Sequence, residues 1–205
     1  MTEPVVEGRL RFDFPAPWQA VKFDDTAWYR ETIKSRVKAV DIVAFHGDRH
    51  WWIEVKDCLG FEADNLPRLA AGEPAAVQTV REWTESEGYK NLVLVKRAKP
   101  FIVDEVAEKL EGTLVSLAAA RRAAESEKMP VAEVLPAAGV MAPEAEWTLV
   151  LLLTWKPEAK DFDRLAMRLR DKLDKRLAAF KLDCIVLNEH ERAPNQPWRV
   201  TRITA

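Results

Sequence analysis

Two apolar runs in the first third of the chain carry a clear strand pattern. Residues 39–45 and 51–57 are rich in β-branched and aromatic side chains, which favour strands. Between them lies the polar segment 46–49, in which Gly47 is followed by Asp48, a pair that suits a two-residue hairpin loop. The pattern therefore predicts an antiparallel hairpin.

The position of the loop fixes which residues face one another across this hairpin. Counting outwards from the loop gives three facing pairs: Arg49 and His46, Trp52 and Val43, Glu54 and Asp41. Successive side chains of a strand point to opposite faces, so Lys56 projects from the same face as Glu54. The predicted register brings two carboxylates and a lysine together at the open end of the hairpin.

Other segments of the chain have helical periodicity or further strand patterns. Apolar residues recur at helical spacing in three segments: 75–87, 101–125 and 161–181. Short apolar runs predict strands at 147–155, 184–187 and 198–203. Residues 91–95 are either a short buried strand or an extension into the next element. Strands that alternate with helices predict an α/β fold with a mixed β-sheet.

Several features mark breaks in this pattern. Gly112 lies inside the predicted helix 101–125 and counts against one unbroken helix. Asp24 or Asp25 is the expected N-cap of a short helix before the hairpin. The length of 205 residues suits a single domain. We expect that domain to contain two further features: an insertion at 60–100 and a flexible connector at 126–146.

The facing carboxylates of the hairpin need a positively charged partner. Two acids directly across a hairpin repel each other, and burying them without a partner is costly. Magnesium or manganese is the simplest partner, because both ions take hard oxygen ligands. A lysine beside such an ion can orient or help to activate a water molecule. Asp41, Glu54 and Lys56 therefore predict a metal site suited to the cleavage of phosphodiesters.

This arrangement resembles the signature of a known superfamily. Asp41, followed on the next strand by Glu54-Val55-Lys56, is similar to the motif of the PD-(D/E)XK nucleases, which share the restriction-endonuclease-like fold. The resemblance implies that Asp41 and Glu54 bind Mg²⁺ or Mn²⁺. It also implies that the backbone carbonyl of Val55 adds a ligand and that Lys56 assists catalysis. Val40 stands where the signature has a proline.

The resemblance extends over residues 20–125 and implies a fold and further site residues. The implied fold is a restriction-endonuclease-like core, a central mixed β-sheet flanked by helices. Such folds commonly open with a helix whose acidic or polar side chain reaches the metal site, and three acids are candidates here: Asp24, Asp25 and Glu31. In this superfamily a helix also follows the catalytic strand and packs on the sheet. Glu105 and Lys109 on that helix could approach the site, but we expect them to be solvated surface charges.

Charge is distributed in local patches rather than as a bulk excess. The net charge of −2 is not that of a protein that coats nucleic acid. One basic cluster adjoins the predicted site and is the candidate for contact with nucleic-acid phosphates: Arg30, Lys34, Arg36 and Lys38. The basic residues of 161–181 are mixed with acidic ones, which is typical of a solvated helix face.

The composition also argues against several classes of protein. No apolar run reaches the ~20 residues of a membrane span, and the first residues lack the pattern of a signal peptide. Cys58 and Cys184 are too few for a disulfide framework. No glycine-rich phosphate loop is present. We therefore expect a cytoplasmic protein that does not bind a membrane.

Two functions from different classes remain open. The first is a metal-dependent nuclease that hydrolyses the phosphodiester bonds of nucleic acid, with DNA as the expected substrate. The second is a catalytically inactive nuclease-like fold that serves as a binding or assembly module. Metal binding separates them, since a scaffold has no reason to keep two facing carboxylates unpaired. No DNA-reading motif is visible, so a homodimer or a partner protein would supply targeting.

Overall fold

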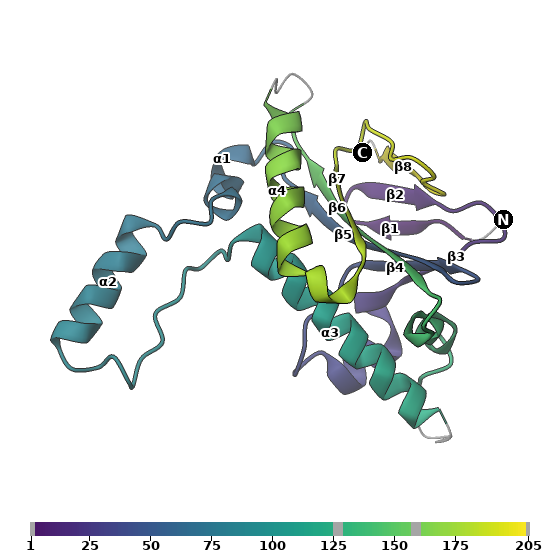
Figure 1. Ribbon diagram of the computed structural model, residues 1–205, viewed down its shortest axis with the longest axis horizontal. Coiled ribbons are helices and arrows are strands. Elements are labelled where there is room, and N and C mark those ends of the chain that lie inside the picture. The colour runs from purple at the N-terminus through teal and green to yellow at the C-terminus, as the bar shows by residue number, and fades with distance from the viewer. Residues whose placement is uncertain (1–2, 125–128, 157–160, 204–205) are drawn as a thin grey trace.

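The computed structural model describes residues 3–124, 129–156 and 161–203. They form three layers and an arm that extends from them (Figure 1). The central layer is a five-stranded mixed sheet in the order β3-β4-β5-β6-β7. Helices α3 (Ile102–Ala123) and α4 (Phe162–Arg176) cover one face, and a three-stranded sheet covers the other. The predicted α/β class with a mixed sheet is confirmed, although helices cover only one of the two faces.

The central sheet joins an antiparallel half to a parallel half. Strand β4 (Ile42–His46) pairs antiparallel with β3 (Gln19–Lys22) on one side and with β5 (Arg49–Asp57) on the other. Strands β6 (Glu146–Thr154) and β7 (Asp183–Leu187) continue the sheet in parallel pairing. A parallel neighbour requires a long crossover, which α3 provides before β6 and α4 before β7.

The hairpin register predicted by counting is confirmed. Val43 pairs with Trp52, and His46 pairs with Arg49. Gly47 has a φ of +57°, the left-handed conformation that a tight hairpin loop requires and that glycine adopts without steric cost.

The smaller sheet packs against the face of the central sheet opposite the helices. It consists of β1 (Val5–Glu7), β2 (Leu10–Asp13) and β8 (Arg199–Arg202), all antiparallel. Leu10 and Phe12 of β2, together with Trp198 just before β8, share a core with Trp51 and Ile53 of the hairpin. The two strands at residues 5–13 were not predicted from the sequence.

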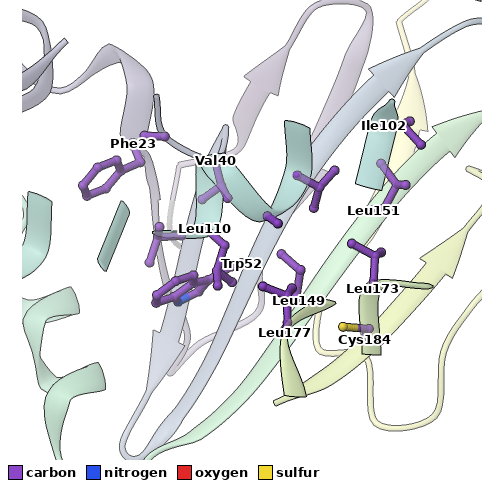
Figure 2. Packing of buried hydrophobic residues seen from close by; sticks show 14 of the residues in the cluster. Phe23, Val40, Trp52, Ile102, Leu110, Leu149, Leu151, Leu173, Leu177 and Cys184 are labelled. Carbon is purple, nitrogen blue, oxygen red and sulfur yellow. The ribbon is translucent and has the colours of Figure 1, made fainter. Parts of the chain in front are cut away.

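The main core lies between the central sheet and the two long helices (Figure 2). Trp52, Leu149 and Leu151 point from the sheet toward the helices, and Leu110 and Leu173 meet them from α3 and α4. Because strand side chains alternate, Glu54 lies on this same helix-covered face, two residues beyond Trp52. The candidate site is thus built against the main core rather than on an open face of the sheet.

Helix α3 passes through Gly112 without a break, contrary to the expectation from the sequence. A Cβ atom at Gly112 would lie 2.0 Å from the carbonyl oxygen of Lys38. The glycine is therefore required by the close approach of the helix to the segment that leads into β4, and not by a helix end. The helix predicted at 161–181 is shorter, since α4 ends at Arg176 and a 3-10 turn, η5 (Ala178–Phe180), follows.

Residues 70–99 form an arm that extends away from the three layers (Figure 1). Helix α1 (Glu62–Asn65) and a 3-10 turn, η3 (Leu66–Leu69), precede it, and α2 (Ala75–Ser86) lies within it, close to the predicted helix. The alternative of a buried strand at 91–95 is wrong, because Leu92 is 79% exposed and Leu94 is 73% exposed. The strand propensity of this segment is not realised, since in the described chain no strand pairs with it.

The segment before β4 is helical but is not capped as predicted. A 3-10 turn, η1 (Phe23–Asp25), precedes a π-helical turn, η2 (Tyr29–Ile33). Neither aspartate caps it: Thr26 Oγ1 accepts a hydrogen bond from the Tyr29 N–H at 3.2 Å. The Thr26 hydroxyl also donates to the Phe23 carbonyl at 2.8 Å and so links the two turns.

The described part of the predicted connector is packed against the body of the protein. Residues 129–146 contain a 3-10 helix, η4 (Leu135–Met141), which contacts α3. Val134, Ala137 and Val140 of this segment belong to the main core. Residues 126–128 of the predicted connector lie outside the described residues. Within the described ranges, none of the helices has the length and apolar character needed to cross a membrane.

Candidate functional site

The open end of the hairpin places the two predicted carboxylates opposite each other. Ile42 pairs with Ile53, so the next residues outward are Asp41 and Glu54. Asp41 immediately precedes β4, and its Oδ2 accepts a hydrogen bond from the N–H of Val55 at 2.7 Å. At the point where β4 begins, the Asp41 carboxylate thus accepts the hydrogen bond that the Val55 N–H would otherwise donate to a backbone carbonyl of the neighbouring strand. This bond holds Asp41 beside the Glu54-Val55-Lys56 segment.

A lysine that the sequence analysis assigned to the surface bridges the two carboxylates. The Nζ atom of Lys109, on α3, lies 3.1 Å from Asp41 Oδ1. The same atom lies 2.7 Å and 2.9 Å from the two carboxylate oxygens of Glu54. The side chain of Lys109 is only 16% exposed, so the expectation of a solvated surface charge is wrong. The acid pair therefore has a cationic partner within the protein.

A second lysine and a third carboxylate extend this network. Lys56 Nζ lies 2.8 Å from Glu54 Oε1 and 2.8 Å from Glu105 Oε1. Glu105 also accepts a hydrogen bond from Arg68 at 3.0 Å, and its side chain is 12% exposed, which again contradicts the expected solvated charge. The network alternates three acids with three bases: Asp41, Lys109, Glu54, Lys56, Glu105 and Arg68.

The spacing of residues on α3 explains how one helix face supplies these groups. Glu105, Lys109 and Thr113 are four residues apart and lie on one side of the helix. Thr113 Oγ1 accepts a hydrogen bond from the Val40 N–H at 3.0 Å, next to Asp41. This four-residue spacing could have identified Lys109 from the sequence, because Glu105 and Lys109 each precede an apolar residue of the buried helix face, Val106 and Leu110.

Burial has the largest effect on the pKa of Glu54. Desolvation, reinforced by the charge of Asp41, raises the pKa of Glu54 to about 7, although Lys56 and Lys109 oppose the shift. Burial alone would lower the pKa of Lys109, but Glu54 and Asp41 outweigh it, and the pKa is raised. The lysine is therefore charged, whereas Glu54 changes its protonation state near neutral pH.

Of the three candidate acids on the opening segment, Asp24 interacts with Asp41. The Phe23 N–H donates to the Asp41 carbonyl at 2.8 Å, which fixes η1 beside Asp41. Burial and the charge of Asp41 raise the pKa of Asp24 to about 6. Its Oδ1 atom is buried and has no hydrogen-bond partner among the described residues. Asp25, by contrast, is exposed and pairs with Lys22 at 3.1 Å, and Glu31 is exposed.

The predicted phosphate-contacting cluster lies on the surface of the chain that leads into Asp41. All four of its members are exposed: Arg30, Lys34, Arg36 and Lys38. Lys38 pairs with Glu108 of α3 at 2.9 Å, and both side chains are more than half exposed, at 53% and 57%. An exposed pair of this kind contributes little to stability, so the lysine can exchange its partner at low cost.

The donors at the hairpin end are of the oxygen type that a hard divalent cation takes. Asp41 and Glu54 offer carboxylate oxygens, and Val55, whose N–H is bound to Asp41, offers a backbone carbonyl. The unpartnered Asp24 oxygen is a further acceptor near this group. No group of three or more His, Cys, Asp or Glu side chains in the described ranges is arranged to hold a metal. Lys109 lies between the two carboxylates that would take one.

These groups can support two kinds of chemistry. The carboxylates and the carbonyl can hold an oxygen-loving cation beside Lys56. With the Lys109 ammonium in place, the same carboxylates form a charge-balanced network that requires no metal.

Comparison of the chain with protein-family models, with curated proteins and with solved structures gave no match.

Proposed function

We propose that this protein is a metal-dependent nuclease with a restriction-endonuclease-like core, and that it hydrolyses phosphodiester bonds in nucleic acid, with DNA as the expected substrate. One observation carries the proposal. Asp41, Glu54 and Lys56 meet at one end of a hairpin, with the Val55 N–H bound to Asp41. A helix that follows this strand and packs over the same residues adds support, as does Asp24 beside Asp41, a half-buried acid whose Oδ1 atom is buried.

The proposed mechanism assigns a role to each residue of the network. Asp41, Glu54 and the Val55 carbonyl would hold Mg²⁺ or Mn²⁺, which supplies water activation and charge stabilisation when bound. Glu54 and Glu105 hold the Lys56 ammonium at 2.8 Å from each. From that position Lys56 orients the attacking water or adds positive charge near the phosphorus as the transition state forms.

The exposed basic cluster would bind the nucleic-acid backbone. Arg30, Lys34 and Arg36 lie on the surface just before the chain enters the site. Such contacts position the substrate by charge and do not read its sequence. Binding that depends on them weakens as the salt concentration rises, because phosphate contacts release counterions.

A second candidate function is a non-catalytic binding or assembly module with the same fold. The observation that favours it is the contact of Lys109 with both carboxylates, at 3.1 Å from Asp41 and 2.7 Å from Glu54. A network already balanced in charge has no need of a metal ion. Metal binding, and not the presence of the acids, therefore separates the two functions.

The test is a calorimetric titration of Mn²⁺ and Mg²⁺ into the purified protein, followed by cleavage assays on single- and double-stranded DNA and RNA. Asp41→Asn should abolish both metal binding and cleavage while the protein stays folded. Asp13→Asn is the matched control, because Asp13 pairs with Arg11 in the smaller sheet and its side chain is 44% exposed. Wild-type protein that binds neither Mn²⁺ nor Mg²⁺ and cleaves none of the four substrates would favour the second candidate.

A further inference from the structure

The contacts of Lys109 bear directly on how a metal would enter the proposed site. Its ammonium touches three of the four carboxylate oxygens of Asp41 and Glu54, at 3.1, 2.7 and 2.9 Å. The Glu54 side chain is fully buried, and that of Asp41 is 8% exposed. A divalent ion bound by the same oxygens would meet this positive charge at short range.

We propose that Lys109 is an internal counter-ion that competes with the divalent metal for Asp41 and Glu54, so that the metal binds only when the ammonium leaves. This inference rests on the proposed function and adds a regulatory element to the same site. In the metal-free protein, Lys109 offsets part of the negative charge of the acid pair and holds the two side chains in place. In the metal-bound protein, Lys109 takes another partner.

The side chain of Lys109 can move while its backbone stays in place. Lysine carries its charge on a flexible four-carbon stem, and this side chain reaches solvent with 16% of its surface. Glu105 lies one turn earlier on the same face of α3, and the charge of Lys109 already contributes to the lowered pKa of Glu105. Glu105 is therefore a ready alternative partner for the displaced ammonium.

The helix itself is held in place by contacts that do not involve the Lys109 side chain. Thr113 accepts a hydrogen bond from the Val40 N–H at 3.0 Å. Gly112 lies against the Lys38 carbonyl, too close for any larger residue. The Thr113 hydroxyl donates to the backbone carbonyl of Lys109 at 2.8 Å. The exchange therefore requires rotation of one side chain and no movement of α3.

The experiment measures Mn²⁺ affinity by calorimetry in a set of variants at one pH above neutrality. Lys109→Met should bind Mn²⁺ at least about tenfold more tightly than wild type, because a competing close charge has been removed. Lys109→Arg keeps the charge and should bind as weakly as wild type. Lys90→Met is the matched control, since it removes a lysine–glutamate pair on the arm. The double variant Asp41→Asn with Lys109→Met should not bind.

Thermal unfolding with and without Mn²⁺ provides a second readout that does not depend on cleavage. Mn²⁺ should raise the unfolding temperature of Lys109→Met more than that of wild type at the same metal concentration. If Lys109→Met does not fold, Lys109→Gln serves instead, because its amide still donates to Glu54 but carries no charge.

The possible outcomes separate this inference from the function on which it rests. Tighter binding in the uncharged variant, lost again with Asp41→Asn, supports both. Equal Mn²⁺ affinity in wild type and in the uncharged variant overturns the competition and leaves the nuclease proposal standing. No binding in either protein overturns both.

Discussion

The substitution Gly112→Ala tests how α3 is docked over the site. A Cβ atom at this position would lie 2.0 Å from the Lys38 carbonyl oxygen, 3.1 Å from the Lys38 carbonyl carbon and 3.2 Å from Val37 Cβ. The first distance is far shorter than a normal van der Waals contact, and the oxygen atom that the Cβ would meet belongs to the backbone and cannot rotate away. Either α3 or the segment before β4 must therefore shift.

The size of the effect follows from two opposing contributions. Alanine in a helix interior is favoured over glycine by about 1 kcal/mol. Overpacking costs about 1–3 kcal/mol, and a clash with backbone lies at the upper end of that range. The net loss is about 2 kcal/mol, which lowers the unfolding temperature of a domain of this size by about 4–8 °C.

The assay is thermal unfolding of Gly112→Ala beside Gly72→Ala. Gly72 is the matched control, because a Cβ atom there meets nothing within 4 Å and its φ is not in the left-handed region. Its replacement should leave stability unchanged or raise it by about 0.4–1 kcal/mol. If Gly112→Ala unfolds at the wild-type temperature, α3 does not approach Lys38 as described. The position of Lys109 over Asp41 would then lose its explanation.

Two further predictions concern acids on β5. The pKa of Glu54 rises from 4.5 in the unfolded chain to about 7 in the folded protein, so the folded state holds the extra proton and stability falls as pH rises through this window. Urea unfolding across this pH window should show that the free energy of unfolding of wild type falls by up to about 3 kcal/mol relative to that of Glu54→Gln. Parallel pH profiles of the two proteins would contradict the burial of Glu54. Asp57→Asn should cost about 1–2 kcal/mol, since Asp57 receives hydrogen bonds from Arg9 and Arg202 and is partly screened by solvent. The pKa of Asp57 is lowered to about 2, so its contribution to stability should be present above about pH 4 and vanish as pH falls through 2. The measurement compares the denaturant midpoints of wild type and Asp57→Asn. Equal midpoints of the two proteins at neutral pH would refute the prediction.

The local features of the site could be read from the sequence because they depend on neighbours in the chain. The loop at Gly47 fixes the strand register, and the register alone brings Asp41 opposite Glu54. The alternation of strand side chains then places Lys56 beside Glu54, at 2.8 Å. Each step extends only a few residues from a turn whose conformation is set by one glycine.

The sequence by itself determined the hairpin, the two long helices and the identity of the acid pair, because periodicity and turn chemistry act over short distances. Only the tertiary structure decided what neutralises that pair. Lys109 is 68 residues from Asp41, and its contact depends on how closely α3 packs against Lys38. The strand propensity of residues 91–95 is likewise unrealised, because pairing requires a neighbouring strand and none of the described strands lies beside the arm. Contacts between distant segments are set by the packing of whole elements, which no local pattern encodes.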